Sequence, residues 1–130
     1  MEYYNYKNTN LNFLVPNDWE LDQTENNLIT MYNYVNSLGV LQFSVYYPPD
    51  AGSVSLKNEL IDFVSDNHND FDIHEGKHYV YTDYLLEENG SYMKYWVIRK
   101  DEAIIFGTYN CDKEQRGLEE KVVDEIIEAI

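Results

Sequence analysis

The sequence is poor in the residue types that bind anions or form covalent cross-links. It contains one cysteine, Cys111, so an internal disulfide is excluded. Lysine and arginine number 9 against 24 aspartates and glutamates, which gives a formal net charge of −15 at pH 7. A surface of this charge repels nucleic-acid phosphates and anionic lipid, and it attracts basic surfaces and cations. We therefore expect no nucleic-acid binding and no membrane binding.

Long apolar runs are also missing. Residues 1–7 contain no basic stretch that leads into an apolar one, so no secretion signal is predicted. No segment approaches the roughly 18 apolar residues of a membrane-spanning helix. These two absences predict a cytoplasmic location. The 130 residues, 44% of them hydrophobic, suffice for one domain with one core over residues 1–130, in which residues 1–10 form a flexible or edge segment.

The first half of the chain has the alternation of β-strands. Residues 11–15 predict a short strand, which a proline and a turn then end. A second strand is predicted over residues 28–35. The cleanest alternation of apolar and polar side chains lies over residues 41–47 and predicts a third strand. Pro48 and Pro49 end it, because neither residue can donate to a sheet ladder.

After the prolines the hydrophobic period changes to that of a helix. Leu56, Leu60 and Val64 recur at helical spacing, and Ser55 is placed to cap the first turn. The polar segment that follows, residues 66–77, is expected to be a loop.

Residues 79–111 predict a three-stranded antiparallel meander. Asn89-Gly90 is a strong hairpin signal, because a two-residue type I′ turn needs positive φ at both central positions. Such a turn places Leu86 opposite Met93. A second turn is expected near Asp101-Glu102.

Both faces of this meander carry large apolar side chains, whereas a sheet with one wet face would show polar residues there. In the expected register Trp96 lies opposite Gly107, whose missing side chain leaves room for the indole. A last helix, starting near Asp112 or Gln115, has an apolar stripe of its own. The stripe consists of Leu118, Val122, Val123, Ile126, Ile127 and Ile130.

One helix on each face of the sheet is the simplest way to cover both. The sequence therefore predicts an α+β fold, a three-layer α/β/α sandwich. Its sheet is expected to have six mainly antiparallel strands, in the element order βββαβββα. We find no internal repeat and no linker that would mark a second domain.

The opening of the chain resembles a known superfamily. A short strand runs into a Pro-x-x-Trp motif, here Phe13-Leu14-Val15-Pro16-Asn17-Asp18-Trp19, as in Mog1/PsbP-like domains. The order of strands and helices in the rest of the chain is similar, and some small bacterial proteins resemble the superfamily in the same way. The resemblance implies a compact α/β/α sandwich around an antiparallel sheet. The superfamily includes a Ran-GTPase-binding factor and photosystem accessory subunits, which are interaction proteins, but none of their functional residues can be carried over here.

A histidine-containing acidic loop is the first candidate site. His68, His74 and His78 lie among carboxylates, and both kinds of side chain bind zinc-like ions. The spacing matches no standard zinc motif. As a calcium loop starting at Asp66 it would place Phe71 where the turn glycine is required. We interpret the segment as a solvated acidic loop, and we predict no metal and no cofactor.

Catalytic motifs are not found. Cys111 ends an apolar strand, which favours a buried structural thiol over a nucleophile. The sequence has no Gly-x-Ser-x-Gly motif, no phosphate-binding loop and no dinucleotide fingerprint. We therefore predict no catalytic residue and expect a binding protein rather than an enzyme.

Aromatic and acidic side chains provide a candidate partner-binding surface. Aromatic rings beside carboxylates suit a protein partner that offers arginine. The last helix carries carboxylates at i,i+4 steps, whose repulsion costs only a few tenths of a kcal/mol per pair. In the competing interpretation, the helix covers this sheet face and the aromatic rings belong to the core. The candidate residues are Tyr81, Asp83, Tyr92, Trp96, Tyr109, Glu120, Asp124 and Glu128.

The leading hypothesis is a non-catalytic cytoplasmic protein that presents this acidic, tyrosine-rich surface to a basic protein partner. One concrete form is an inhibitor or immunity-type protein that neutralises a basic toxin or nuclease, an encounter that electrostatic steering would accelerate. The alternative is a small-molecule- or metal-binding domain, with enzymes included, that uses a pocket near Trp19. An enclosed pocket with converging polar groups would favour the alternative.

Overall fold

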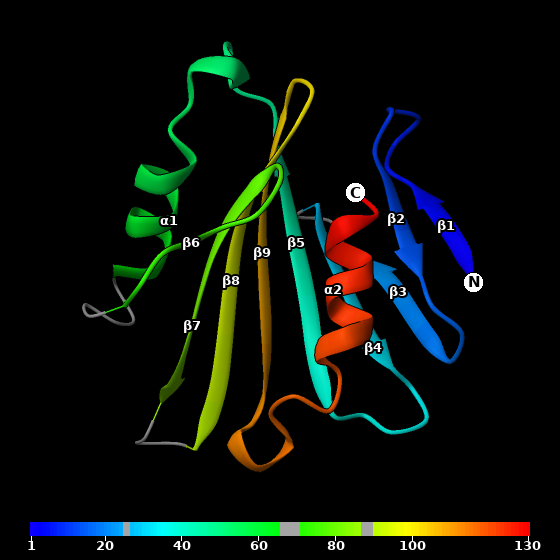
Figure 1. Ribbon diagram of the computed structural model, residues 1–130. Coiled ribbons are helices and arrows are strands. Elements are labelled where there is room, and N and C mark those ends of the chain that lie inside the picture. The colour runs from blue at the N-terminus through cyan, green and yellow to red at the C-terminus, as the bar shows by residue number, and fades with distance from the viewer. Residues whose placement is uncertain (25–26, 66–70, 87–89) are drawn as a thin grey trace.

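The structure, a computed structural model, describes residues 1–24, 27–65, 71–86 and 90–130 (Figure 1). These residues form nine strands, two α-helices and two short 3-10 helices. The strands are β1 (Glu2–Asn5), β2 (Asn12–Val15), β3 (Trp19–Gln23), β4 (Leu28–Asn33), β5 (Gly39–Tyr46), β6 (His74–Glu75), β7 (Tyr79–Leu86), β8 (Ser91–Lys100) and β9 (Ala103–Asp112). The helices are η1 (Ala51–Ser53), α1 (Leu56–Ser65), η2 (Lys113–Gln115) and α2 (Glu120–Glu128).

One antiparallel sheet of seven strands, in the order β3-β4-β5-β9-β8-β7-β6, forms the platform. The prediction of an α+β fold is confirmed. The prediction of six strands in the order βββαβββα is wrong in its details. Strand β3 was not predicted, although its Trp-Glu-Leu-Asp sequence alternates as a strand should. The short β6 lies in the segment that was expected to be a loop.

The sequence predicted that the strand over residues 11–15 belongs to the main sheet. In the structure, β2 does not join that sheet. It pairs with β1 (Glu2–Asn5) in a separate antiparallel hairpin, and the expectation of a flexible or edge segment over residues 1–10 stays a prediction. Phe13 of this hairpin is fully buried, and its ring lies 5.1 Å from that of Phe43 on β5. The hairpin lies beside α2 and packs on the same core (Figure 1). The hairpin is therefore held against the sheet by burial of the Phe13 side chain, and not by backbone pairing between β2 and a strand of the sheet.

The two helices cover opposite faces of the sheet, because each packs against side chains of different parity on the same strands. Leu60 and Val64 of α1 pack with Val97 on β8 and Ile104 on β9. Val123 and its neighbours on α2 pack on the face formed by the even-numbered residues of β8 and the odd-numbered residues of β9, together with the β1–β2 hairpin. None of the helices in the described part of the chain is long and apolar enough to cross a membrane.

Helix α1 covers only part of its sheet face. Over β3, β4 and β5 the same face carries polar groups that bond to one another. The Tyr32 hydroxyl donates to Glu20 at 2.8 Å, and the Gln42 amide donates to Thr30 at 3.2 Å. This half of the sheet is therefore a wet face, which the expectation of two fully apolar faces did not include.

The register of the meander is partly as expected. Trp96 pairs with Gly107, as predicted. A side chain at Gly107 would lie 3.1 Å from Cε1 of Phe43 and 3.4 Å from Cε3 of Trp96, so the glycine accommodates both rings.

The β7–β8 hairpin differs from the prediction by two residues, since Leu86 pairs with Ser91 rather than with Met93. The connection is therefore longer than two residues, and Asn89 lies outside the described residues. Because side chains alternate with a period of two, this shift leaves every side chain on its predicted face.

The start of α1 follows the sequence. The Oγ atom of Ser55 accepts a hydrogen bond from the backbone N–H of Asn58 at 3.2 Å, the geometry of an N-cap. We expect Ser55→Ala to lower the free energy of unfolding by about 1 kcal/mol. Urea unfolding of the variant checks this, with Ser53→Ala as a control, because Ser53 caps no α-helix. An unchanged midpoint for Ser55→Ala would contradict the capping role.

Helix α2 starts later than the sequence suggests. Residues near Asp112 form η2 instead, and α2 begins at Glu120. Gly117 has φ +90°, which interrupts the helical path. Leu118 is consequently 68% exposed and contributes nothing to the buried stripe, whereas Val123, Ile126 and Ile127 are buried as predicted.

Candidate binding site between α2 and the sheet

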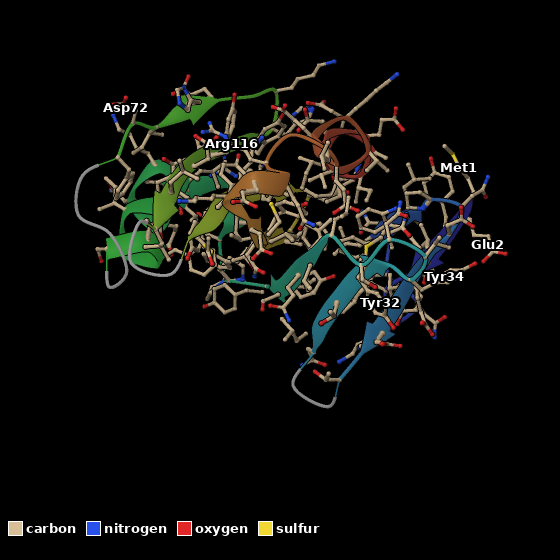
Figure 2. The ribbon with its side chains drawn as sticks, turned by 90° about the horizontal axis from the view of Figure 1, so that it is seen from below. Met1, Glu2, Tyr32, Tyr34, Asp72 and Arg116 are labelled. Atoms are coloured by element: carbon tan, nitrogen blue, oxygen red, sulfur yellow. The ribbon has the colours of Figure 1, made fainter. Side chains whose placement is uncertain are left out.

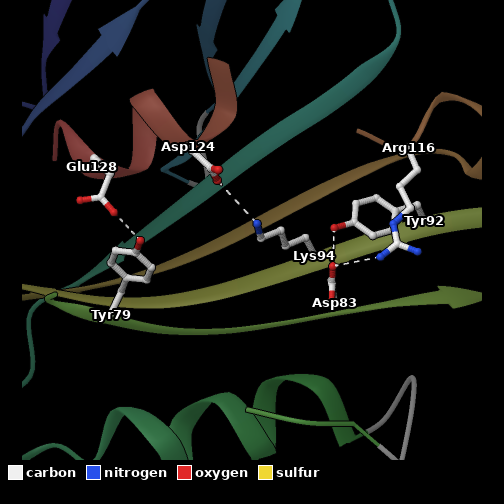
Figure 3. Close-up of polar contacts among 7 residues, drawn as sticks. All are labelled: Tyr79, Asp83, Tyr92, Lys94, Arg116, Asp124 and Glu128. Atoms are coloured by element: carbon white, nitrogen blue, oxygen red, sulfur yellow. Dashed lines mark hydrogen bonds and ion pairs between the residues drawn. The ribbon is translucent and has the colours of Figure 1, made fainter. Parts of the chain in front are cut away.

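A cavity of about 220 Å³ lies between the first turns of α2 and strands β7, β8 and β9. Five of the eight candidate surface residues line it: Asp83, Tyr92, Tyr109, Glu120 and Asp124. Lys94 and Arg116 complete its charged lining (Figure 3). The sequence predicted only that some of these residues share one face of the sheet and that the others share one helix. The fold brings them together because α2 crosses that face.

Lys94 is the most buried cation of the site. Only 9% of the residue is exposed, because it stands on the sheet face beneath α2. Its ammonium lies 3.6 Å from Oδ1 of Asp124, and it also lies 4.9 Å from the ring centre of Tyr81 and 5.2 Å from that of Trp96. Contact with aromatic faces and with one carboxylate compensates the loss of hydration.

Arg116 lies at the mouth of the cavity, between η2 and α2. Its guanidinium carbon is 4.9 Å from the ring centre of Tyr92, and its Nη2 atom is 3.7 Å from Oδ2 of Asp83. That same oxygen accepts a hydrogen bond from the Tyr92 hydroxyl at 2.7 Å. Asp83 thus serves two groups of the site at once (Figure 3).

Tyr109 and Glu119 form a buried polar pair behind the cavity. The hydroxyl of Tyr109 donates to Oε1 of Glu119 at 2.8 Å, and Glu119 is only 5% exposed. A buried carboxylate without such a donor would cost about 1–3 kcal/mol or more. The ring of Tyr109 fits here because Gly39 on β5 has no side chain, since a Cβ atom would lie 2.5 Å from Cζ of the ring.

The exposed edge of α2 beside the cavity is acidic. Glu120, Asp124 and Glu128 are exposed along it, and with Lys121 and Glu125 they line a shallow depression. Glu128 also accepts a hydrogen bond from the Tyr79 hydroxyl at 2.5 Å, at the wall of a second cavity of about 560 Å³ (Figure 3). The carboxylates therefore run from the smaller cavity toward the C-terminal end of α2.

The aromatic part of the predicted surface is mostly interior. Trp96 is 1% exposed, and Tyr92 and Tyr109 are also buried, because α2 covers this face of the sheet. Tyr81 is partly buried beside Lys94. The competing interpretation, in which the aromatic rings are core, therefore describes these rings better than an exposed aromatic patch. What remains accessible is the acidic edge and the cavity.

Arg116 and Glu119 were not among the candidates. Arg116 lies in a loop with no hydrophobic pattern, so only its position before the acidic helix could have pointed to it. Glu119 carried no signal at all, since charged residues are rarely buried and exposure is the ordinary expectation.

Burial raises the pKa of several tyrosines, on the face of the sheet that carries the site and, for Tyr84, on the face beneath α1. The pKa values of Tyr79, Tyr84, Tyr92 and Tyr109 all lie above the usual value, first because of burial and second because each hydroxyl donates a hydrogen bond. For Tyr92 the acceptor is Asp83, and for Tyr109 it is Glu119. All four therefore stay protonated where an exposed tyrosine ionises.

These shifts predict alkaline instability. The unfolded chain releases its tyrosine protons near the ordinary pKa of about 10, whereas the folded chain retains them, so the unfolded state binds fewer protons above that pH. Stability is therefore fully present below pH ~10 and is lost as the pH rises further. Absorbance of tyrosinate during an alkaline titration should show these four rings ionising only together with unfolding. Ionisation of all tyrosines while circular dichroism stays native would contradict the burial argument.

Other candidate positions have structural roles or remain untested. Cys111 is buried, as predicted, and burial raises the pKa of its thiol. Trp19 belongs to the core and does not line either of the two cavities described above. His74 and His78 are exposed, whereas Asp66, His68 and Asp70 lie outside the described residues. The interpretation of that loop stays a prediction.

Two solved structures resemble this fold. The solution structure of cyanobacterial PsbP (CyanoP) from Synechocystis sp. PCC 6803 matches 98% of this chain and 89% of that chain, with a TM-score of 0.67 and 10% sequence identity. A crystal structure from Bacteroides thetaiotaomicron VPI-5482 matches 89% of this chain with a TM-score of 0.58 and 15% identity. This chain spans only 42% of that Bacteroides protein. No family model and no curated protein matches the sequence.

Proposed function

We propose that this chain, which has a PsbP-like fold, is a non-catalytic binding protein that recognises a basic protein partner through the acidic face of α2 and the adjoining cavity. One concrete form is an inhibitor or immunity-type protein that neutralises a basic toxin or nuclease. The cytoplasmic location expected from the sequence remains part of the proposal.

One observation carries the proposal. Glu120, Asp124 and Glu128 are exposed on one helix face, next to a cavity whose lining has three carboxylates and two cations. The chain as a whole has a net charge of −15, so its long-range field attracts the same kind of partner that this face would contact. Complementary charge accelerates such an encounter and selects against acidic partners.

A cavity with converging polar groups, which the alternative of a small-molecule or metal pocket requires, is present, but it lies at α2 and not near Trp19. Trp19 is buried in the core, and the polar groups converge near α2 instead. We therefore retain the protein-binding proposal alone.

Charge-removing variants test the proposal. The triple variant Glu120→Gln, Asp124→Asn, Glu128→Gln removes three charges from α2, and the control Asp50→Asn, Glu59→Gln, Asp62→Asn removes three charges near α1. The wild type and both variants are immobilised and exposed to cell extract at salt concentrations of about 0.05 M and about 0.5 M. Wild type and control should recover the same partner at low salt and lose it at high salt, and the α2 variant should not recover it. Recovery that is equal for all three proteins, or that is unaffected by salt, would refute the role of this face.

A further inference from the structure

The cavity between α2 and the sheet has a lining in which carboxylates outnumber cations. Asp83, Glu120 and Asp124 contribute three negative charges, while Lys94 and Arg116 contribute two positive ones. The lining therefore has one negative charge in excess. Lys94 lies next to Asp124 and Arg116 next to Asp83, whereas the carboxylate of Glu120 makes no hydrogen bond or ion pair with the side chains that the structure describes.

Arg116 shows which chemical group fits the mouth of this cavity. Its guanidinium lies over the ring of Tyr92 and beside Asp83, so it meets an aromatic face and a carboxylate together. A planar guanidinium suits both contacts better than an ammonium does. The Arg116–Asp83 separation of 3.7 Å is longer than a direct hydrogen bond, and Oδ1 of Asp83 accepts no hydrogen bond from the described residues.

Arg116 is also held weakly. Half of its side chain, 51%, is exposed, and the ion pair with Asp83 is of the surface kind that contributes little to stability. The next residue, Gly117, has φ +90°, and apart from its two neighbours in the chain no described residue has an atom within 4 Å of the place where its side chain would be. The side chain of Arg116 can therefore leave the cavity mouth without disturbing the core.

We propose that this cavity accepts one arginine side chain of the basic partner, and that the incoming guanidinium displaces Arg116 from Tyr92 and Asp83. The inference rests on the proposed function, because it assigns the residue of the partner that the site recognises. Arg116 then acts as an internal competitor. A bidentate approach to Asp83 would give the partner's arginine a stronger contact than Arg116 makes at 3.7 Å. The carboxylate of Glu120, which Arg116 does not contact, is a second acceptor for the partner's arginine in the same cavity.

A capped tripeptide with arginine between two glycines tests this directly. The ¹⁵N-labelled chain is titrated with the peptide while the amide signals of Lys94 and Gly117 are followed. Arg116→Ala should bind the peptide more tightly than wild type by up to about fivefold, the factor that a surface ion pair represents. Asp83→Asn should weaken binding by about tenfold or more, because the charge-assisted hydrogen bonds are lost. A peptide with citrulline in place of arginine should not bind.

Lys113→Ala is the matched control. It removes the same positive charge from the same connection, but Lys113 does not line the cavity, so its effect should stay within about twofold. Equal gains for Arg116→Ala and Lys113→Ala would mean general electrostatics and would overturn the proposal. Weaker or unchanged binding by Arg116→Ala, or no binding by either protein, would also overturn it.

These outcomes are separable from the test of the proposed function. If the α2 variant loses its partner but Arg116→Ala gains no affinity for the peptide, the acidic face stands and the arginine assignment fails. If the α2 variant recovers the partner as well as wild type does, the proposed function fails first.

Discussion

Gly39→Ala should lower the free energy of unfolding by about 2–3 kcal/mol, although it adds only one methyl group. The added carbon would lie 2.5 Å from Cζ and 2.7 Å from Cε1 of Tyr109. Neither Gly39 nor the ring of Tyr109 is exposed, so the ring cannot move into solvent without opening the core. Displacement of the ring also removes the donor that Glu119 needs, which adds the cost of a buried, unpaired carboxylate.

Urea unfolding of Gly39→Ala beside Gly52→Ala measures this effect. The control glycine is exposed, and the nearest atom to its added carbon is Oδ1 of Asp50 at 3.6 Å, so its cost should stay within about 0.5 kcal/mol. The clash is assigned to Tyr109 by a double-mutant cycle, because Gly39→Ala should cost much less when Tyr109 is already alanine. Additive effects in this cycle would show that the ring of Tyr109 is not the cause of the stability loss in Gly39→Ala.

Ile126→Ala should destabilise the protein by about 2–5 kcal/mol. Ile126 is fully buried between α2 and the sheet face that carries Trp96, so its truncation leaves a cavity in the larger core. The cost depends on α2 covering this face, since an exposed isoleucine would lose almost nothing.

Ile61→Ala is the control for this prediction. It makes the same chemical change on α1, where the side chain is 39% exposed, and should cost less than about 1 kcal/mol. Because both changes raise helix propensity, the difference between them reports burial alone. Similar losses for the two variants in thermal and urea unfolding would contradict the position of α2.

Much of the fold was predictable because side-chain periodicity reports burial. The pairing of Trp96 with Gly107 was predicted from size complementarity, and the N-cap at Ser55 from local chemistry. Strand β3 was missed although its alternation was visible, because the turn expected after Pro16 was not followed by a prediction for residues 19–23. The predicted register of the β7–β8 hairpin was wrong by two residues, because a strong turn signal does not report the length of the loop.

Two further features, at the two ends of the chain, were not predicted for a different reason. Both the separate β1–β2 hairpin and the later start of α2 at Glu120 depend on contacts between distant parts of the chain. Periodicity within one segment does not contain that information. The same holds for the wet half of the sheet face over β3, β4 and β5, which α1 does not cover because it packs over β7 and β8.

The candidate site was predicted in part. Asp83 and the carboxylates of α2 were named from their spacing, and the fold brings Asp83, Glu120 and Asp124 to one cavity. The arrangement of Lys94 beneath α2 and of Arg116 across Tyr92 could not be predicted, because both depend on how the helix crosses the sheet. Sequence spacing indicated the acidic groups, whereas the position of Arg116, labelled in Figure 2, beside them was identified only by the packing.

Hydrogen–deuterium exchange of the chain with and without an alternating arginine–glycine peptide at low salt tests the central claim most directly. If the acidic face of α2 and its cavity bind basic partners, amides in residues 116–130 should gain protection, and α1 should exchange at an unchanged rate. The gain should disappear in the variant that lacks the three α2 charges. Protection centred on α1 or on β3, or the same gain in that variant, would contradict the account.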